Sequence, residues 1–251
     1  MRIAGLEKLS TVDYPGKPAA VIFTAGCNYR CFYCHNLAIC GNPPLIDEEE
    51  VFRYLGKRIP LLEGVVITGG EPTLQEDLVH VMRRIRGLGL AVKLDTNGSR
   101  PEILEPLLTE GLADYVAMDL KAPLPLYPKI CGCSADGIAE SMSLLAASGI
   151  PYEFRTTVWP GMTEDMLFEM RDLLPAGSRW YLQKCRGNGK YGDGAGGDVL
   201  KNLMQKLTMP DLDHHRRSTT ERPFEVVAAG ILSKLVDQAD GDAEKPPPFG
   251  G

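Results

Sequence analysis

The stretch Thr24-Ala-Gly-Cys27-Asn-Tyr-Arg-Cys31-Phe-Tyr-Cys34-His-Asn36 places three cysteines within eight residues, in the spacing Cys-x3-Cys-x2-Cys. It directly follows residues 19–23, an apolar run typical of a buried strand. Thiolates are the usual protein ligands of cubane iron–sulfur clusters, and three of them can hold three of the four irons. The fourth iron is then open to a small molecule. The stretch therefore predicts a reaction centre rather than a structural staple.

Two other uses of the cysteines fit less well. A structural zinc ion needs four ligands, usually in two separated pairs, and His35 directly follows Cys34, so its side chain is expected to point away from the metal. A fourth ligand from Cys40 or from a distant residue stays open. A disulfide framework fits poorly, because seven cysteines is an odd number and a chain of 251 residues needs no stapling.

Composition indicates one globular α/β unit. The chain has 251 residues, of which 44% are hydrophobic, and a formal net charge of -6. The short basic run His214-His-Arg-Arg217 is too small to predict nucleic-acid binding. The N-terminal residues have no apolar signal region, and no apolar stretch approaches membrane-spanning length. We therefore expect a cytoplasmic protein that binds neither nucleic acid nor membrane and keeps its thiols reduced.

Apolar runs and amphipathic patterns alternate through the first three quarters of the chain. Helical periodicity is clear in four sets of residues: Val51, Leu55 and Ile59; Leu74, Leu78, Val81, Met82 and Ile85; Ile138, Met142 and Leu145; Met166, Met170 and Leu173. Asp47 is a candidate helix start. Six β-then-α units predict a parallel sheet with helical crossovers that curls into all or part of a barrel. The predicted strands are residues 19–24, 64–68, 90–95, 115–119, 152–158 and 179–184.

Distinctive polar residues follow these strands. Gly69-Gly70-Glu71-Pro72 follows the second strand, Asp95-Thr96-Asn97-Gly98 ends the third, and Asp119 and Lys121 close the fourth. In a barrel of parallel strands the active site lies at the carboxyl ends. Each motif also has an ordinary reading, because glycine and Asn-Gly are common in turns and Asp119 with Lys121 can form a simple ion pair. Their shared placement with the cysteines favours a site.

The C-terminal quarter has a different composition. We divide the chain into a core at residues 1–185, a glycine-rich linker and extension at residues 186–236, and a disordered tail at residues 237–251. Within the extension, residues 199–207 have a pattern compatible with a helix, and residues 226–236 are apolar enough for a helix or a strand. Cys40, Cys131, Cys133 and Cys185 form no second cluster motif and are interpreted as free thiols.

From residue 1 to about residue 185 the chain resembles the radical S-adenosylmethionine (radical SAM) activases of glycyl radical enzymes. Within them it is most similar to the anaerobic ribonucleoside-triphosphate reductase activating proteins. The segments that carry this resemblance, besides the cysteine spacing, are Asp13-Tyr-Pro-Gly16, Cys34-His-Asn36, Thr68-Gly-Gly-Glu-Pro-Thr73, Asp95-Thr-Asn-Gly98, Met118-Asp-Leu-Lys121 and Arg155-Thr-Thr-Val-Trp-Pro-Gly161. The resemblance implies a partial (β/α)6 TIM-like barrel of the radical SAM type, followed by a divergent, partly disordered C-terminal tail.

The same resemblance implies a chemistry. Cys27, Cys31 and Cys34 would hold a [4Fe–4S] cluster whose open iron is chelated by SAM. An electron from flavodoxin or ferredoxin would cleave SAM and give a 5′-deoxyadenosyl radical. That radical would abstract a hydrogen atom from a glycine Cα of a partner, with anaerobic ribonucleotide reductase as the natural one. The protein would supply orientation and exclusion of water, so no side chain is assigned as a catalyst.

The resemblance also implies roles for individual residues. Tyr33 and His35 would lie against SAM, and the turn Gly69-Gly70-Glu71 would meet its amino group. Asp95 with Thr96 would bind the ribose or a nearby monovalent cation, Asp119 would join the cation or SAM site, and Lys121 would face the SAM carboxylate. Asp13 would hold the incoming glycyl loop. After Gln183-Lys-Cys-Arg186 the chain turns to glycine where activases continue with a further SAM contact, so that contact is unassigned.

Three other functions remain open on the sequence. The chain can be an activase of pyruvate formate-lyase or of another glycyl radical enzyme. It can also be a radical SAM enzyme that acts on a small molecule. From a different class, it can be a non-catalytic zinc or iron–sulfur binding module, but this function does not require the Gly-Gly-Glu turn or the polar residues shared across one edge.

Overall fold

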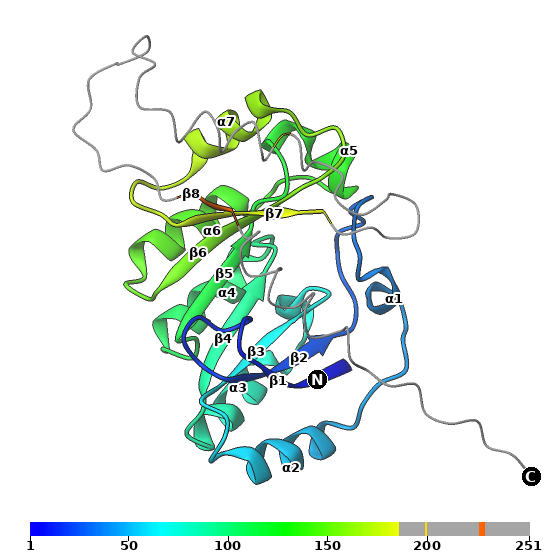
Figure 1. Ribbon diagram of the computed structural model, residues 1–251, viewed down its shortest axis with the longest axis vertical. Coiled ribbons are helices and arrows are strands. Elements are labelled where there is room, and N and C mark those ends of the chain that lie inside the picture. Colours follow the sequence, from blue (N-terminus) through cyan, green and yellow to red (C-terminus); the bar gives the residue numbers. More distant parts are fainter. Residues whose placement is uncertain (186–198, 200–225, 229–251) are drawn as a thin grey trace, which may run out of the picture.

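The computed structural model describes residues 1–185, residue 199 and residues 226–228 (Figure 1). Within them one eight-stranded sheet has its strands in chain order, β1 to β8. Strand β1 is antiparallel to β2, and every later strand is parallel to its predecessor. The strands are β1 (Ile3–Ser10), β2 (Ala19–Thr24), β3 (Gly64–Gly69), β4 (Ala91–Thr96), β5 (Tyr115–Asp119), β6 (Tyr152–Val158), β7 (Trp180–Lys184) and β8 (Val226–Ala228).

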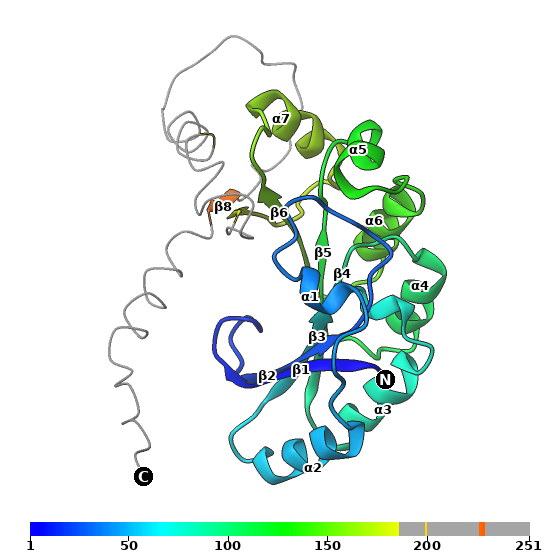
Figure 2. The same cartoon turned by 90° about the vertical axis from the view of Figure 1, so that its right-hand side faces the viewer.

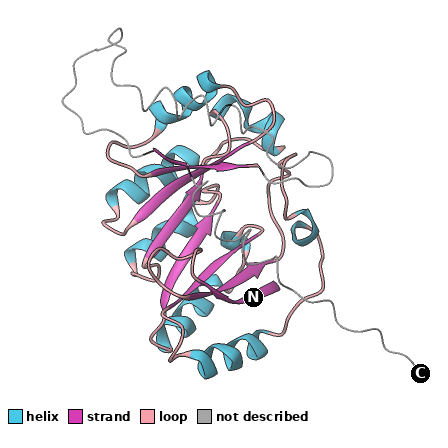
Figure 3. Cartoon of the chain, viewed as in Figure 1, coloured by secondary structure: helices cyan, strands magenta, loops and turns pink. Residues whose placement is uncertain are grey.

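The sheet is curved but unclosed, so the molecule is a partial barrel, as the sequence predicts. Helices α2 (Glu48–Arg58), α3 (Leu78–Gly87), α4 (Pro101–Thr109) and α6 (Ile138–Ala147) line its convex side (Figure 2). The remaining helices are α7 (Glu164–Leu173), which follows β6, and the short α1 (Leu37–Cys40) and α5 (Tyr127–Cys131). Figure 3 shows the strands as one continuous layer against these helices. Connections of this kind bring all carboxyl strand ends to one edge.

Burial explains why the central strands are apolar throughout. Val65, Val66 and Ile67 follow one another on β3, and each has an exposed fraction of 0%. Consecutive strand residues point to opposite sides, so both faces of this sheet are covered, as expected for a parallel sheet. Lys93, on the neighbouring β4, is equally buried at 1% exposure, which is unusual for a lysine.

Local signals set the helix starts. The Asp47 side chain accepts a hydrogen bond from Glu50 N at 3.0 Å, which confirms the predicted start of α2. Three glutamates then occupy the first turn, where the helix dipole favours negative charge. Thr163 caps α7 in the same way, accepting from Met166 N at 3.3 Å.

Several elements differ from the expectations. Strand β1 lies where the sequence predicts none, because it is a half-exposed edge strand that contains charges and a glycine. Helix α4 is also unpredicted, since Pro101 and Pro106 argue against a helix, although Pro101 stands at the first turn, where proline is tolerated. Ile59 follows the end of α2 and Leu173 ends α7, and both are exposed rather than buried in the predicted apolar faces.

The predicted boundaries near residues 185 and 236 border or fall within the part of the chain outside the described residues. The same holds for the linker, the disordered tail and most of the helix predicted at residues 199–207. Residues 226–228, at the start of the predicted apolar segment, form strand β8 beside β7. In the described part of the chain, none of the helices has the length and apolar character needed to span a membrane.

Candidate cofactor-binding site

Residues 27–34, here called the cysteine loop, follow the carboxyl end of β2. Main-chain hydrogen bonds hold the loop and its entry between two short helices. Gly26 N donates to Ile39 O of α1 at 2.8 Å, and Arg30 N donates to Cys131 O of α5 at 2.7 Å. The loop is therefore positioned mainly by its backbone, which leaves its three thiols available for chemistry.

Each cysteine of the motif has a second thiol beside it. The Cys40 thiol lies beside the sulfurs of Cys27 and Cys34, and the Cys131 thiol lies beside that of Cys31. These contacts, opposed by burial, lower the pKa of all three motif thiols, that of Cys34 to about 6. Thiolates are the form that binds iron, so the environment favours the ligating state.

The donor set fits an iron–sulfur cluster in chemistry. None of the seven cysteines, all of which lie within residues 1–185, forms a disulfide, and the three predicted ligands lie on one loop at the carboxyl edge of the sheet. The neighbouring thiol differs among them, because it is Cys131 for Cys31 and Cys40 for the other two. Among the residues that the structure describes, no three Cys, His, Asp or Glu side chains converge in a metal-binding geometry. The roles of Cys27, Cys31 and Cys34 as cluster ligands thus stay a prediction that their chemistry supports.

The predicted glycine turn packs directly on the entry to the cysteine loop. Gly69 has φ +114°, and a Cβ at this position would lie 2.5 Å from Thr24 N. A Cβ on Gly70 would lie only 1.8 Å from Gly26 O. Both positions therefore require glycine, because any side chain would push the turn away from the loop.

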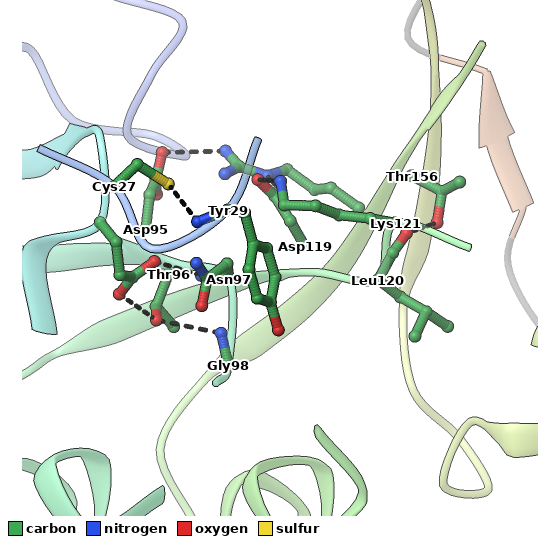
Figure 4. Close-up of polar contacts among 12 residues, drawn as sticks. Cys27, Tyr29, Asp95, Thr96, Asn97, Gly98, Asp119, Leu120, Lys121 and Thr156 are labelled. Carbon is green, nitrogen blue, oxygen red and sulfur yellow. Dashed lines mark hydrogen bonds and ion pairs between the residues drawn. The ribbon is translucent and has the colours of Figure 1, made fainter. Parts of the chain in front are cut away.

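Glu71 joins two loops of the site. Its carboxylate is buried at 1% exposure. It accepts hydrogen bonds from Thr73 N and Oγ1 at 3.1 and 2.6 Å, from Thr96 Oγ1 at 2.7 Å and from Asn97 N at 2.7 Å. Burial raises the pKa of Glu71, and the hydrogen bonds oppose that rise. Glu71 and Thr96 thus fix the glycine turn against the loop that follows β4, which Figure 4 shows around Thr96 and Asn97.

Five charged side chains, four on β4, β5 and β6 and one just after β5, form what we call the strand-end network, and Figure 4 shows Asp95, Asp119 and Lys121 among them. Asp95 Oδ1 lies 2.5 Å from Lys93 Nζ, and its Oδ2 lies 3.0 Å from Arg155 Nη1. Asp119 Oδ1 lies 3.0 Å from Arg155 Nε, and its Oδ2 lies 3.2 Å from Lys121 Nζ. Asp119 and Arg155 are register partners on adjacent strands, so the sheet itself aligns them.

The network keeps its carboxylates ionised. Burial alone would raise the pKa of Asp95, but Arg155 and Lys93 outweigh it and lower that pKa. The same balance, set by Arg155 and Lys121, lowers the pKa of Asp119 to about 2. Lys121 also helps to lower the pKa of Cys27, Cys31 and Cys34. It therefore links the network electrostatically to the cysteine loop.

Aromatic rings cover this junction. Tyr33 stacks on Trp159 with ring centroids 6.5 Å apart, and Phe32 meets Trp159 edge-on at 5.7 Å. Trp159 Nε1 donates to Lys121 O at 3.0 Å, and the Tyr127 hydroxyl accepts from Lys121 N at 3.1 Å. Tyr33 and Trp159 are both buried. These rings cover the main chain of Lys121, whose side chain keeps an exposed fraction of 18%.

Two predicted residues are exposed, and one of them lies apart from this cluster. His35 is exposed at the end of the cysteine loop. Asp13 is also exposed and lies in the β1–β2 connection, where it accepts a hydrogen bond from Ser10 Oγ at 2.5 Å. Ser10 pairs with Ala19, the first residue of β2, whereas the cysteine loop follows its last residue. The structure therefore brings together the predicted residues at the carboxyl strand ends but not Asp13.

Sequence reasoning gave no role to five neighbours of the site. Lys93 sits inside a run read as an apolar strand, and only its charge marks it as unusual. Arg155 and Trp159 lie in a segment that carries the resemblance, but no role was assigned to them. Cys40 and Cys131 were interpreted as free thiols, and only the fold shows that they approach the motif cysteines.

Comparison with known proteins identifies the class. Residues 21–174, more than half of the chain, match the model of the Radical SAM superfamily. The chain therefore belongs to the radical SAM superfamily, whose enzymes use a [4Fe–4S] cluster and SAM. A provisionally named glycyl-radical enzyme activating enzyme of Methanocaldococcus jannaschii is 37% identical over 171 residues, which cover 65% of this chain and 70% of that protein. This likeness places the chain, within the superfamily, with the glycyl-radical enzyme activating enzymes.

Other relatives differ in how much of their own length this chain covers. Pyruvate formate-lyase 1-activating enzyme of Escherichia coli is 31% identical over 174 residues, covering 65% of this chain and 70% of the relative. A GTP 3′,8-cyclase of Thermococcus kodakarensis, named as probable, is 31% identical over 171 residues, covering 63% of this chain but only 54% of the relative. The chain thus spans about half the length of the cyclases that it matches.

Solved structures support the fold alone. The crystal structure of Streptococcus suis SuiB bound to its precursor peptide SuiA matches with a TM-score of 0.62 at 14% identity. The match covers 87% of this chain and 50% of that one. At this identity the likeness carries no information on substrate, but it agrees with the open α/β barrel described above.

Proposed function

We propose that this enzyme generates a glycyl radical by removing a hydrogen atom from a glycine Cα of anaerobic ribonucleoside-triphosphate reductase. The observation that carries the proposal is coverage: the likeness extends over 70% of the activating enzymes and over about half of the cyclases. The choice of the reductase rests on the segments that resemble its activating proteins. Pyruvate formate-lyase is the second candidate partner, favoured by the relative from Escherichia coli.

Some residues of the chain would hold the cluster and SAM, and others would shield them from water. Cys27, Cys31 and Cys34 would hold the cluster, which together with SAM supplies the radical chemistry when bound. Lys121 would offer a positive charge to the carboxylate of SAM, and the glycine turn would offer main-chain groups to its amino end. Tyr33 and Trp159 would keep water and stray hydrogen donors away.

Two further parts of the proposal concern the setting of the reaction. The electron that starts the reaction would come from flavodoxin or ferredoxin. The enzyme would work in the cytoplasm, where thiols stay reduced. Asp13, on the exposed β1–β2 connection, would contact the glycyl loop of the partner, which requires that loop to reach beyond the strand ends.

Anaerobic electron paramagnetic resonance tests the proposal. The reconstituted, reduced enzyme is mixed with SAM and either anaerobic ribonucleotide reductase or pyruvate formate-lyase. We expect a SAM-dependent change of the cluster signal and a glycyl radical doublet on the reductase. The doublet should be absent when the target glycine is replaced by alanine. A doublet on pyruvate formate-lyase alone would overturn the choice of partner. A cluster that responds to SAM with neither partner radicalised would overturn both candidate partners and point to another glycyl radical enzyme.

A further inference from the structure

In the strand-end network, every carboxylate oxygen is already paired with a cationic side chain of the chain itself. Asp95 and Asp119 have four carboxylate oxygens between them, and each lies within 3.2 Å of a cationic nitrogen of the chain. Two aspartates face three cations, so the network carries one net positive charge. Without Lys93 the remaining four side chains would be neutral in sum.

This arrangement does not fit the monovalent cation that the family resemblance implies near Asp95 and Asp119. Hard cations are bound by several oxygen ligands whose lone pairs point at them. Here those oxygens already point at Lys93, Arg155 and Lys121. An added cation in contact with Asp95 would also lie beside two fixed positive groups, where poor hydration makes like-charge repulsion strong.

Lys93 places a positive charge on Asp95, one of the two aspartates beside which such a cation would lie. Its side chain is 2% exposed, and its strand neighbours Val92 and Leu94 are fully buried. Its ammonium lies 2.5 Å from Asp95 Oδ1 and 6.0 Å from the centre of the Tyr115 ring. A buried ammonium is unfavourable unless a negative group pairs with it, so Lys93 and Asp95 depend on each other. Lys93 thus brings to Asp95 the single positive charge of a monovalent ion.

We propose that the ammonium of Lys93 is a built-in substitute for an exchangeable monovalent cation, and that SAM binding by this enzyme is therefore independent of K⁺ and Na⁺. Lys93 acts through Asp95 as a positioning residue. The inference rests on the use of SAM by the family, and not on which protein is activated. Its test needs no partner protein, so failure of the proposed partner leaves it intact.

The experiment measures SAM affinity of the reconstituted, reduced enzyme under anaerobic conditions, from the change of the cluster signal. Titrations are run at one ionic strength in KCl, in NaCl and in tetramethylammonium chloride. For the unmodified enzyme we expect dissociation constants that agree within about twofold. A loss of about tenfold or more in tetramethylammonium would show that an external cation is required and would overturn the proposal.

Variants at Lys93 make the test specific. Lys93→Met keeps the length of the side chain but frees one oxygen of Asp95, so its SAM affinity should become at least about tenfold stronger in KCl or NaCl than in tetramethylammonium. Lys93→Arg keeps a charge and should stay independent of the salt, as should Lys57→Met on the exposed side of α2. A Lys93→Met enzyme that binds SAM equally in all three salts would also overturn the proposal. If that variant fails to fold, the salt series on the unmodified enzyme remains decisive.

Binding of the ion itself gives a second readout. The oxidised holoenzyme can be titrated with NaCl and followed by sodium NMR line width. Lys93→Met should broaden the sodium signal in a way that KCl reverses, whereas the unmodified enzyme and Lys93→Arg should not. If all three proteins broaden the sodium signal equally, the ammonium of Lys93 does not take the role of the ion.

Discussion

The cysteine loop and the strand-end network meet at Lys121, but they are built in opposite ways. The loop is one continuous stretch held by main-chain hydrogen bonds to α1 and α5, and its thiols lie beside those of Cys40 and Cys131. The network draws four of its side chains from three strands and the fifth, Lys121, from just after β5, and it fixes them by ion pairs. The comparison shows that the predicted cluster ligands lie on one local loop. The charged side chains next to that loop are held in place by the sheet.

The largest effect that tests this contrast is expected in the cysteine loop. Cys31→Ala should reduce bound iron from about four atoms per chain to well below one, because two thiolates of one loop do not retain a cubane cluster. Iron analysis and visible absorbance after anaerobic reconstitution measure this loss. Folding of the chain should persist, since Cys31 contributes no main-chain support to the sheet.

Cys40→Ala and Cys131→Ala are the matched controls. Each removes a thiol that contacts a motif cysteine without removing a predicted ligand. Both variants should keep most of the iron. If Cys40→Ala loses as much iron as Cys31→Ala, Cys40 is a fourth protein ligand. That result would favour a four-ligand, zinc-type metal site over an iron–sulfur cluster with an open iron.

The second effect concerns Glu71, which connects the glycine turn beside the cysteine loop to the loop that follows β4. Glu71→Gln replaces a carboxylate that accepts four hydrogen bonds by an amide whose NH2 must face a donor. We expect the free energy of unfolding to fall by about 2–3 kcal/mol, in line with a buried polar group left unsatisfied. Urea unfolding of the full chain without cofactors measures it. Glu76→Gln, at an exposed position of the same connection, should change stability by less than about 0.5 kcal/mol.

The difference between the two regions also decides how much of the site the sequence predicts. The cysteine spacing is local, so it identifies Cys27, Cys31 and Cys34 without knowledge of the fold. Asp95, Asp119 and Lys121 are recognised because they end predicted strands. The role of Lys93 is not predicted, because it depends on burial of the side chain beside Asp95. A strand pattern in the sequence does not reveal that burial. The approach of Cys40 and Cys131 depends on how α1 and α5 close around the loop.

The fold shows the same division. The six predicted parallel strands agree with the observed ones to within one residue at each end, because apolar runs buried on both faces are a strong signal. The edge strand β1 and the proline-containing α4 are missed, since their patterns are set by what covers them. Asp13 illustrates the limit: the resemblance assigns it to the partner's glycyl loop, but its position follows from the hairpin register.

A third, smaller effect is the acid sensitivity of the network. Burial tends to raise the pKa of Asp119, but Arg155 and Lys121 outweigh it and bring the pKa from 3.8 to about 2. A carboxylate with a lowered pKa stabilises the fold above its unfolded value, and this stability is lost as the pH falls from about 4 toward 2. The side chain is 33% exposed, so we expect screening to limit the contribution to about 1 kcal/mol.

Asp119→Asn isolates this contribution, because the amide does not titrate. The stability difference between the unmodified chain and the variant should shrink by about 0.5 kcal/mol between about pH 5 and pH 3, which is roughly half of the contribution. Urea unfolding at both pH values gives the difference, and Asp165→Asn on the exposed start of α7 should show no such change. A difference for Asp119→Asn that stays constant with pH would mean that the ion pairs do not set the charge of Asp119.

The smallest effect tests how firmly the loop is tied to the sheet. Asn28, in the cysteine loop, accepts from Asn97 Nδ2 at 2.9 Å and donates to Ser99 Oγ at 2.8 Å. Asn28→Ala should cost about 1 kcal/mol in urea unfolding, because Asn97 is buried while Ser99 can turn to water. Asn42→Ala, which loses an exposed hydrogen bond to Arg2, should cost less than about 0.5 kcal/mol. A cost for Asn28→Ala as large as that of Glu71→Gln would make the loop and the sheet one rigid unit. The expected smaller cost leaves the cysteine loop as a separately adjustable part, which a loop that must rearrange its thiols around iron requires.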